Sequence, residues 1–343
     1  MRLRVSQICS TLPAELLARF LGEKWGEPVS ITGIKRFHGG SARQTYRFDA
    51  SAPSGRREAL VLRRDPPSSL IETDRAAEFA ALAAFHRSSV PVPEPLWCEN
   101  TAFGSPGFLM REVAGGTAAG LMEPDPYGED AAAIGTALFT ALGAIHRTAP
   151  AAAGIAPVSA GDAAPARLDH WRRAFEADRF RPEPIVEAAL RWLGRTQVAP
   201  AQRVSIVHGD YRSGNFLRAG SRLVAVLDWE MVHAGDPMED LAWACDPLWS
   251  HGSGRPAATL PLADAHRVWE RASGLTVDPE ALLWWRMFAQ VMGAVIWISA
   301  AREVIDGRSH DPVHAFAGII PYRFHMVTLA RSLSRSLSQG RGA

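Results

Sequence analysis

The spacing of apolar residues changes from a strand period to a helix period about a third of the way along the chain. In the first third, apolar and polar residues alternate between turns that contain glycine, proline and serine, which predicts β-strands. An alanine-rich segment at 72–87 instead has apolar residues at helical spacing. The first third is therefore predicted to be a small antiparallel sheet with one helix. The predicted strands cover residues 31–37, 44–50 and 58–64, a short piece around Leu96, and residues 107–113.

The remaining two thirds are predicted to be mainly helical, with an Ala-, Pro- and Gly-rich loop at 150–165 and a strand–loop–strand insert at 205–229. A sheet-rich segment followed by a helical one is an α+β arrangement. With 343 residues the chain can form two lobes, which we assign to 1–113 and 114–343, with a cleft expected where they meet. The predicted helices cover residues 130–147, 167–178, 184–193, 237–245, 264–272, 279–301 and 322–337.

Composition narrows the class of protein. A net charge of +1 gives no electrostatic reason to expect nucleic acid or membrane partners. Three widely separated cysteines (Cys9, Cys98 and Cys245) have no metal-ligand spacing and predict a reducing, cytoplasmic environment. The N-terminus lacks the continuous apolar run of a signal peptide. The uncharged stretch 287–301 is too short to span a bilayer, so we expect a buried helix there. The oligomeric state stays open.

Polar residues in the 205–229 insert have a spacing that suits phosphoryl transfer. Asp210 and Asn215 are five residues apart in a loop that begins with His208-Gly209-Asp210, and Asp228 ends an apolar strand. Phosphoryl transfer needs an acid to accept the nucleophile's proton, and oxygen ligands for a Mg²⁺ ion that bridges the phosphates. Taken singly, each piece has a simpler explanation, because His-Gly-Asp occurs in ordinary loops and an acid after a strand is often a helix cap.

Taken together, three motifs resemble the aminoglycoside phosphotransferase/choline kinase superfamily, which has a two-lobed, protein-kinase-like fold. The resemblance covers about residues 25–300 and is closest to the kinase-like domain attached to some acyl-CoA dehydrogenases. It implies ATP or GTP as co-substrate, Mg²⁺ as cofactor and a small-molecule alcohol as acceptor. The motifs are His208-Gly209-Asp210-Tyr211 with Gly214-Asn215-Phe216-Leu217, then Val226-Leu227-Asp228-Trp229-Glu230, then Gly235-Asp236-Pro237 with Asp240-Leu241-Ala242.

The resemblance also implies roles for individual residues. Asp210 would be the catalytic base, and Asn215 and Asp228 would bind Mg²⁺. His208 would support the loop, and Asp240 would accept hydrogen bonds from loop amides near the base. Glu230 is either a third acid near the metal or a surface charge.

In the N-terminal lobe, Gly39, Gly40 and Ser41 lie between two predicted strands, where the family has its nucleotide-covering loop. Glycines let backbone amides approach phosphates, although a plain β-hairpin would have the same pattern. The family's third strand normally supplies a lysine paired to a helix glutamate. Here Arg63 stands at that position, with Glu78 as the expected partner. An arginine is a planar fork rather than a point charge, so the exchange is not neutral, and both residues could instead be solvated surface charges.

The segment around Met110 and Glu112 resembles the hinge strand whose backbone would bind the purine. Acceptor recognition would lie in the helical lobe, where residues from 244 onward include eight acids and ten arginines, too few acids for a polycationic sugar. The tryptophans there suggest an aromatic pocket for a hydroxyacyl-CoA or another hydrophobic metabolite, or else simple core packing. The alternatives are an aminoglycoside or macrolide kinase, and a pseudokinase-like nucleotide-binding module. The tryptophans are Trp243, Trp249, Trp269, Trp284, Trp285 and Trp297.

Overall fold

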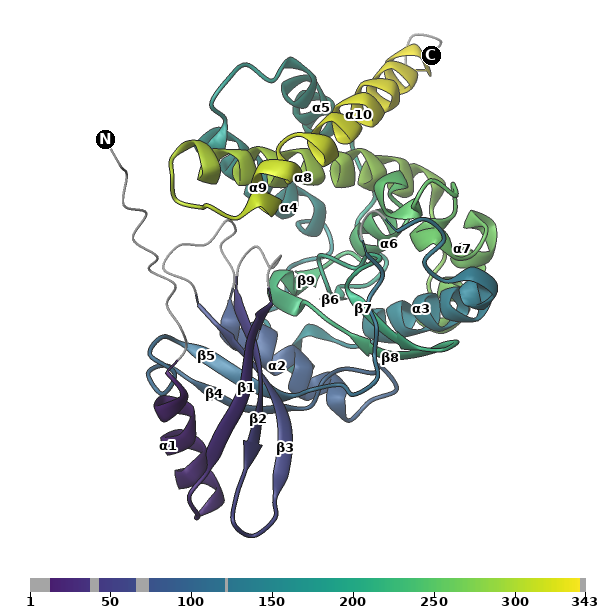
Figure 1. The fold of residues 1–343 in the computed structure, drawn as a ribbon. Helices are drawn as coiled ribbons and strands as arrows, with labels where there is room; N and C mark the ends of the chain where they lie inside the picture. The colour runs from purple at the N-terminus through teal and green to yellow at the C-terminus, as the bar shows by residue number, and fades with distance from the viewer. Residues whose placement is uncertain (1–12, 38–42, 66–73, 121–122, 340–343) are drawn as a thin grey trace, which may run out of the picture. The chain divides into compact units, whose positions relative to one another are not determined.

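The computed structural model describes residues 13–37, 43–65, 74–120 and 123–339 (Figure 1). These residues form two compact units. Unit 1 contains the described residues up to 67 together with 95–112, and unit 2 contains those of 68–94 together with 113–343. The predicted helix at 72–87 is therefore grouped with the helical unit rather than with the sheet. Each unit is described by itself below.

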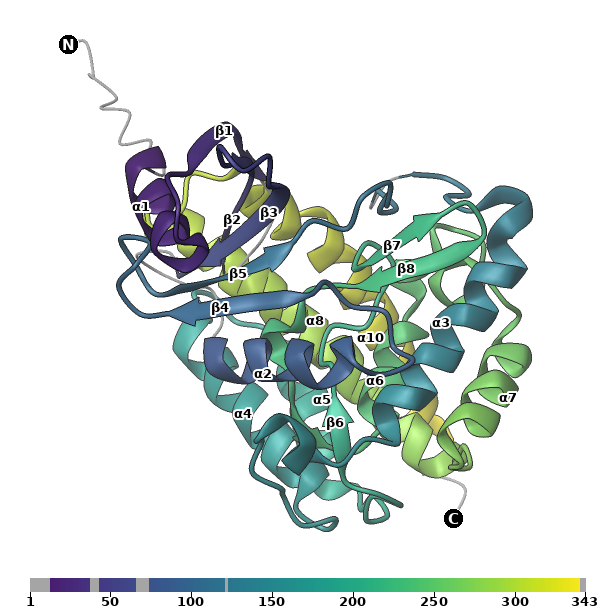
Figure 2. The same ribbon diagram turned by 90° about the horizontal axis from the view of Figure 1, so that it is seen from below.

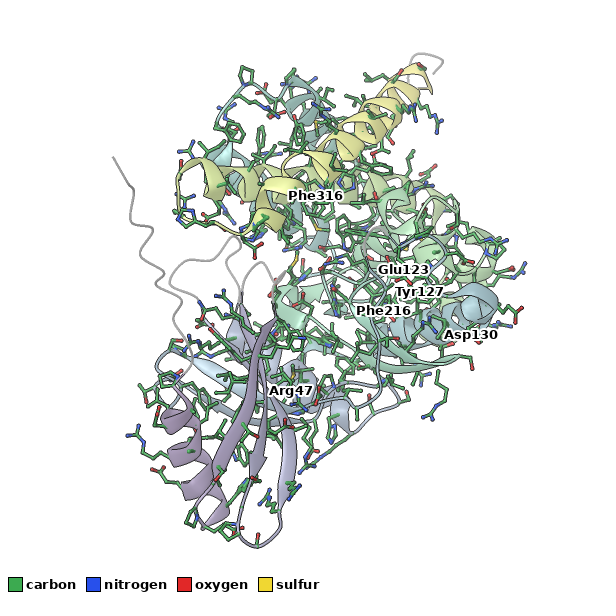
Figure 3. All side chains as sticks on the ribbon, viewed as in Figure 1. Arg47, Glu123, Tyr127, Asp130, Phe216 and Phe316 are labelled. Carbon is green, nitrogen blue, oxygen red and sulfur yellow. The ribbon has the colours of Figure 1, made fainter. Side chains whose placement is uncertain are left out.

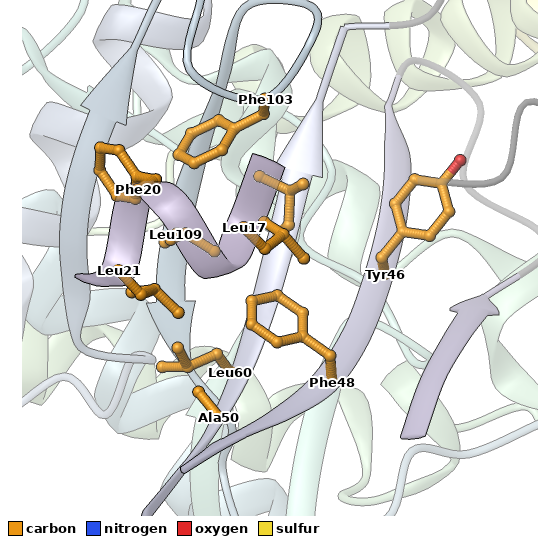
Figure 4. Close-up of a cluster of buried hydrophobic side chains, with 10 residues drawn as sticks. Leu17, Phe20, Leu21, Tyr46, Phe48, Ala50, Leu60, Phe103 and Leu109 are labelled. Carbon is orange, nitrogen blue, oxygen red and sulfur yellow. The ribbon is translucent and has the colours of Figure 1, made fainter. Parts of the chain in front are cut away.

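Unit 1 is a five-stranded antiparallel sheet in the order β1-β2-β3-β5-β4, covered by helix α1 (Ala14–Trp25). Tyr46, Phe48 and Ala50 alternate along β2 and point into the core. They belong to one buried cluster with Leu17, Phe20 and Leu21 of α1 (Figure 4). Burying each large apolar side chain contributes about 1.5–3 kcal/mol, so this one cluster holds the helix on the sheet. The strands are β1 (Ser30–Phe37), β2 (Gln44–Ser51), β3 (Arg57–Arg64), β4 (Pro95–Glu99) and β5 (Gly107–Arg111).

Unit 2 is mainly helical, which together with the sheet of unit 1 confirms the predicted α+β class. Two small two-stranded sheets interrupt the helices: β6 (Ser205–Val207) with β9 (His233–Gly235), and β7 (Phe216–Ala219) with β8 (Arg222–Val226). The helices are α2 (Arg75–His86), α3 (Ala131–His146), α4 (Ala163–Asp178), α5 (Pro184–Arg195), α6 (Met238–Ala244), α7 (Leu262–Ser273), α8 (Pro279–Ile305), α9 (Pro312–Ala317) and α10 (Ile320–Gln339).

Helices α3 and α7 lie side by side in unit 2 (Figure 2). Their close approach depends on a missing side chain. A Cβ atom on Gly143 would lie 2.5 Å from the Cβ atom of Ala272 and 2.8 Å from the backbone nitrogen of Ser273. Real atoms do not approach so closely, so glycine at this position sets the distance between the two helices.

Helix α8 is the longest helix in the described part of the chain, with 27 residues. By length and composition it is the one described helix that could cross a membrane, but 78% of its most apolar window is buried within the protein. This burial agrees with the expected buried helix. The Asp278 side chain begins the helix by accepting hydrogen bonds from the backbone N–H groups of Glu280 and Ala281.

Candidate active site

Strand β6 leads directly into the loop that carries His208, Gly209 and Asp210, and the antiparallel partner β9 fixes where the loop begins. The turn requires glycine at 209 for two reasons. Gly209 has a φ angle of +85°, and a Cβ atom there would lie 2.5 Å from the carbonyl oxygen of Met231. A larger residue would therefore be strained in its backbone and would also collide with the neighbouring segment.

The Asp240 carboxylate, in the first turn of α6, holds this loop from behind. It accepts a hydrogen bond from the backbone N–H of His208 (2.6 Å) and another from that of Gly209 (2.8 Å). It also pairs with Nε2 of His146 at 3.1 Å. Trp269 donates to Nδ1 of the same imidazole, which leaves the proton on Nε2 to point at Asp240. Asp240 is thus placed on the loop amides as the motif predicted.

His208 is buried in the loop and packs beside Trp229. Its Nε2 lies 2.9 Å from the carbonyl oxygen of Leu227, and its Nδ1 accepts from the backbone N–H of Asp210 at 3.2 Å. Burial lowers the pKa of His208, which favours the neutral ring with its proton on Nε2. His208 therefore joins the Asp210 loop to the end of the β7–β8 hairpin.

Side-chain donors surround the Asp210 carboxylate. Trp243 donates its indole N–H to Oδ1 (2.7 Å), and Asn215 donates its amide N–H to Oδ2 (2.7 Å). Arg212 donates from Nε to both oxygens, at 3.0 and 3.1 Å. Hydrogen bonds from several directions fix the plane of a carboxylate, so Asp210 has one orientation here.

The pKa of Asp210 is raised above its usual value, chiefly because burial disfavours the charged form. The guanidinium of Arg212 opposes this shift, and the negative charge of Asp228 adds to it. A carboxylate with a raised pKa is a better proton acceptor than an exposed aspartate. The surroundings therefore suit Asp210 to remove a proton from a hydroxyl group.

Asp228 lies two residues beyond the end of β8, in the left-handed backbone conformation (φ 64°, ψ 58°). This conformation costs a non-glycine residue about 1–2 kcal/mol, and strained residues of this kind often occur at functional sites. The backbone N–H of Leu227 donates to the carbonyl oxygen of Asn215 at 2.8 Å, which ties the Asp228 segment to the Asp210 loop. The structure thus brings Asp210, Asn215 and Asp228 into one part of unit 2.

Asn215 and Asp228 fit a magnesium ion only as a partial ligand set. The Asn215 amide nitrogen is bonded to Asp210, so its side-chain oxygen is the atom that could face a cation. Within the described ranges, no group of three or more His, Cys, Asp or Glu residues could hold a metal. Mg²⁺ is commonly held by one or two protein oxygens, with phosphate oxygens and water completing its shell. The pair is compatible with that pattern.

Glu230 follows in a short 3-10 turn (Trp229–Met231) and is only 6% exposed. The alternative that it is a solvated surface charge is therefore wrong.

In the same unit, a buried salt bridge anchors the neighbouring strand β9. Burial raises the pKa of Glu239, but its contacts with Arg167 and with Nε2 of His233 outweigh this effect and lower the pKa to about 2.

The tryptophans of unit 2 do not form the open aromatic pocket that the sequence suggested. Trp243, Trp249, Trp269, Trp284 and Trp285 are all at most 3% exposed. Most of their indole N–H groups are engaged inside unit 2, for example that of Trp285 with Asp236. Core packing is the correct explanation for these five side chains, because helices on several sides cover them.

Sequence analysis missed two side chains that donate hydrogen bonds to the Asp210 carboxylate. Arg212 is separated from Asp210 by only one residue, so its reach could have been recognised from the sequence. The contact of Trp243 with Asp210 had no such signal, because it joins residues 33 positions apart. Arg212 also stacks over the ring of Trp249 (4.7 Å), which in turn packs edge-on against Trp243 (5.1 Å).

The residues predicted to bind nucleotide are distributed over both units. Gly39, Gly40 and Ser41 lie outside the described residues. Arg63 is on β3 between Thr45 and Phe108, whereas Glu78 is buried in the first turn of α2. Because Arg63 belongs to unit 1 and Glu78 to unit 2, their pairing stays a prediction.

The predicted hinge residues lie at the end of β5 in unit 1. Met110 faces Val61 in the sheet register. The backbone N–H of Glu112 donates to the carbonyl oxygen of Ala59 at 2.9 Å, and its side chain accepts from Arg47 at 3.1 Å. The amide of Glu112 is therefore already used within the sheet. Figure 3 labels Arg47 in this unit and, in unit 2, Tyr127 and Asp130 near the start of α3.

Unit 2 therefore holds Asp210, Asn215 and Asp228 in one part of its structure. The sequence model of the phosphotransferase enzyme family matches residues 33–275, so the chain belongs to that family. Over 244 residues it is 32% identical to mouse acyl-CoA dehydrogenase family member 10, a match that covers 68% of this chain and 22% of the mouse protein. Chicken family member 11 is 26% identical, with 64% of this chain and 28% of that protein covered. The chain thus spans less than a third of these relatives.

Solved structures share the fold. A crystal structure of a putative aminoglycoside phosphotransferase from Ralstonia eutropha has a TM-score of 0.72 and 20% identity, covering 95% of this chain and 99% of that one. A macrolide 2'-phosphotransferase from Brachybacterium faecium has a TM-score of 0.58 and 18% identity, covering 93% and 98%. An aminoglycoside phosphotransferase solved with AMP-PNP and hygromycin B has a TM-score of 0.56 and 18% identity, covering 92% and 98%.

Proposed function

We propose that this protein transfers the γ-phosphoryl group of ATP or GTP to a hydroxyl group of a small molecule. The observation that carries the proposal is the Asp210 carboxylate, oriented by Asn215, Arg212 and Trp243 and given a raised pKa by burial. A proton acceptor in one fixed orientation is what the attack of an alcohol on a phosphoryl group requires.

In the proposed reaction, Asp210 takes the proton from the acceptor's hydroxyl group while the oxygen of that hydroxyl group forms a bond to the γ-phosphorus. The bond between that phosphorus and the β,γ-bridging oxygen breaks, and ADP or GDP leaves with the bonding electron pair. Asn215 and Asp228 would hold Mg²⁺, which offsets charge on the phosphates when bound. Asp240 and His208 keep the loop in place through the contacts described above.

The proposed acceptor is a hydroxyacyl-CoA or a similarly uncharged or anionic alcohol rather than a polycationic sugar. Arg212, a cation, donates hydrogen bonds to Asp210, and from residue 244 onward the chain has eight acids against ten arginines. A positive charge at this position repels a polycation and tolerates an anion. The similarity to acyl-CoA dehydrogenase family members supports the same class, because those proteins are named for acyl-CoA chemistry.

Purified protein tests this assignment. With Mg-ATP or Mg-GTP, we expect phosphate transfer to members of a hydroxyacyl-CoA panel and little transfer to kanamycin-type sugars or macrolides. Asp210→Asn should lower kcat about 10²–10⁴-fold, since that is the usual contribution of a positioned general base. Activity unchanged by Asp210→Asn would refute the mechanism. Efficient transfer to the sugars alone would favour an antibiotic kinase, and nucleotide binding without transfer to any acceptor would favour a pseudokinase-like module.

A further inference from the structure

Helix α10 packs on α8 and carries a buried histidine, His325, that lies between Trp297 and Asp246. His325 has no exposed surface. Its position is 50 residues beyond the end of the family match at 275, so the family assignment gives it no role. The proposed mechanism does not use His325, yet its ring contacts Trp243, which donates a hydrogen bond to Asp210.

Both nitrogens of His325 have partners. Trp297 of α8 donates its indole N–H to Nδ1 at 2.7 Å, so the imidazole proton is on Nε2. That Nε2 lies 3.1 Å from Oδ1 of Asp246, a carboxylate that is only 3% exposed. The ring fits here because α8 has glycine at 293, where a Cβ atom would lie 2.3 Å from Cε1 of His325. Because His325 has a single tautomer in a closely fitted site, it links Trp297 rigidly to Asp246.

Two short routes lead from this pair to the base. Asp246 also accepts from the backbone N–H of Leu248 and so begins the short turn Pro247–Ser250 that carries Trp249. Trp249 supports Arg212, which donates to Asp210. In the second route, the His325 ring lies against the ring of Trp243 at 6.1 Å, and Trp243 donates directly to Asp210.

We propose that His325 is a positioning residue, through which α10 fixes the two side chains, Trp243 and Arg212, that orient the Asp210 carboxylate. The catalytic part of this inference rests on the proposed function. The structural part does not, because it concerns only the hydrogen bonds that Trp243 and Arg212 donate to Asp210. Helix α10 lies beyond the residues matched by the family model. The inference gives this helix a role in holding the active site in place.

The indole N–H signal of Trp243 in ¹⁵N-tryptophan-labelled protein reports on this hydrogen bond without any assay of activity. Trp243→Phe assigns the signal, and Asp210→Asn supplies a reference for a weakened acceptor. We expect His325→Leu to move the Trp243 signal toward that reference. His325→Gln retains a donor for Asp246 and should restore part of the original position.

Tyr322→Phe is the matched control on the same helix. Tyr322 donates to Glu183 at 2.5 Å, so its loss removes a different anchor of α10 and leaves the Trp243 signal in place. In kinetics, His325→Leu should lower kcat about 10-fold or more with little change in the KM for nucleotide, and Tyr322→Phe should not. If His325→Leu fails to fold, Trp297→Phe removes only the donor to Nδ1 and should shift the same signal by a smaller amount.

An unchanged Trp243 signal in folded His325→Leu, or in Trp297→Phe where that variant is needed, would overturn the inference. An equal shift in Tyr322→Phe would also overturn it, since general loosening of α10 would then explain the result. A shifted signal in protein that transfers phosphate to no acceptor would support the positioning role and refute the proposed function instead.

Discussion

Each oxygen of the Asp210 carboxylate accepts hydrogen bonds from two side chains, and these donors set both its orientation and its basicity. Burial raises its pKa, while Arg212 acts in the opposite direction. A base works only in its ionised form, so the activity should fall as the pH decreases through this raised pKa. The acid limb of the pH–rate profile should therefore lie above the range of an exposed aspartate.

Replacing Arg212 by glutamine should shift this limb. Without the guanidinium, the charged form of Asp210 loses its main stabilising partner, so its pKa rises further and the acid limb moves to higher pH. The measurement is kcat against pH for the wild type and Arg212→Gln with the acceptor found above. Arg173→Gln, which removes an exposed arginine paired to Asp169 on α4, is the control. A limb that moves to lower pH would contradict the electrostatic explanation.

Asp228→Asn should separate metal-dependent binding from folding. Asparagine tolerates the left-handed backbone at this position, so the free energy of unfolding should change little, within about 0.5 kcal/mol. The lost negative charge should abolish Mg²⁺-dependent nucleotide binding. Calorimetry with nucleotide, in the presence and absence of Mg²⁺, checks the result, and Asp264→Asn on the exposed start of α7 serves as the matched variant. Wild-type affinity in Asp228→Asn would exclude Asp228 as a ligand.

At the scale of elements, alternation and helical spacing predicted most of the strands and helices. The strands predicted at 31–37, 44–50 and 58–64 correspond to β1, β2 and β3. Helix α4 begins at Ala163 rather than at 167, because Pro165 is accommodated in its first turn, where no helical N–H partner is needed. Helix α9 was missed because six residues are too few to establish a period.

In the candidate site, too, most features with a local sequence pattern were predicted and those that depend on packing were not. Asp210, Asn215 and Asp228 could be found because chemistry and loop geometry restrict their local spacing. The contact of Arg212 with Asp210 is also local. The donor Trp243 and the buried state of the tryptophans instead depend on how α6, α8 and α10 pack, and no local pattern encodes that packing. For the tryptophans, the sequence left both an aromatic pocket and core packing open, because it records residue type but not which helices cover a side chain.

The α3–α7 contact provides a test at this scale. Gly143→Ala should destabilise the protein by about 1–3 kcal/mol, since the new methyl group overlaps Ala272 and the backbone of Ser273, although alanine favours helix by about 1 kcal/mol. Gly194→Ala on α5 is the matched change. Its Cβ atom would meet only the end of the Arg172 side chain, at 3.2 Å, so stability should be unchanged or slightly higher. Denaturant unfolding of both variants decides the matter, and equal effects would contradict the packing argument.

At the scale of the whole molecule, the buried carboxylates link folding to pH. The pKa of Glu239 is lowered from 4.5 to about 2 in the folded protein, so its salt bridges stabilise the fold above about pH 4.5. That contribution, on the order of 3 kcal/mol, is lost as the pH falls from about 4.5 toward 2. Acid unfolding should therefore depend strongly on this residue.

Glu239→Gln should be less stable than the wild type at pH 7, and the difference in unfolding free energy should narrow as the pH is lowered from 5 to 3. Denaturant titrations at several pH values measure this. Glu187→Gln, which removes a more exposed carboxylate paired to Arg179 and Arg191, should show a small difference at every pH. A gap between wild type and Glu239→Gln that widens on acidification would contradict the assigned direction of the pKa shift.

The contacts of Asp240 also have a consequence for protein engineering. Its carboxylate, in α6, accepts hydrogen bonds from the main-chain N–H groups of His208 and Gly209. It also pairs with the imidazole of His146, which lies in α3. The active loop is therefore not a portable peptide. A designer who transplants residues 205–215 into another scaffold must also transplant an acid and a histidine that lie far away in the chain. Without them, the grafted loop would have the same sequence but would not keep the same conformation.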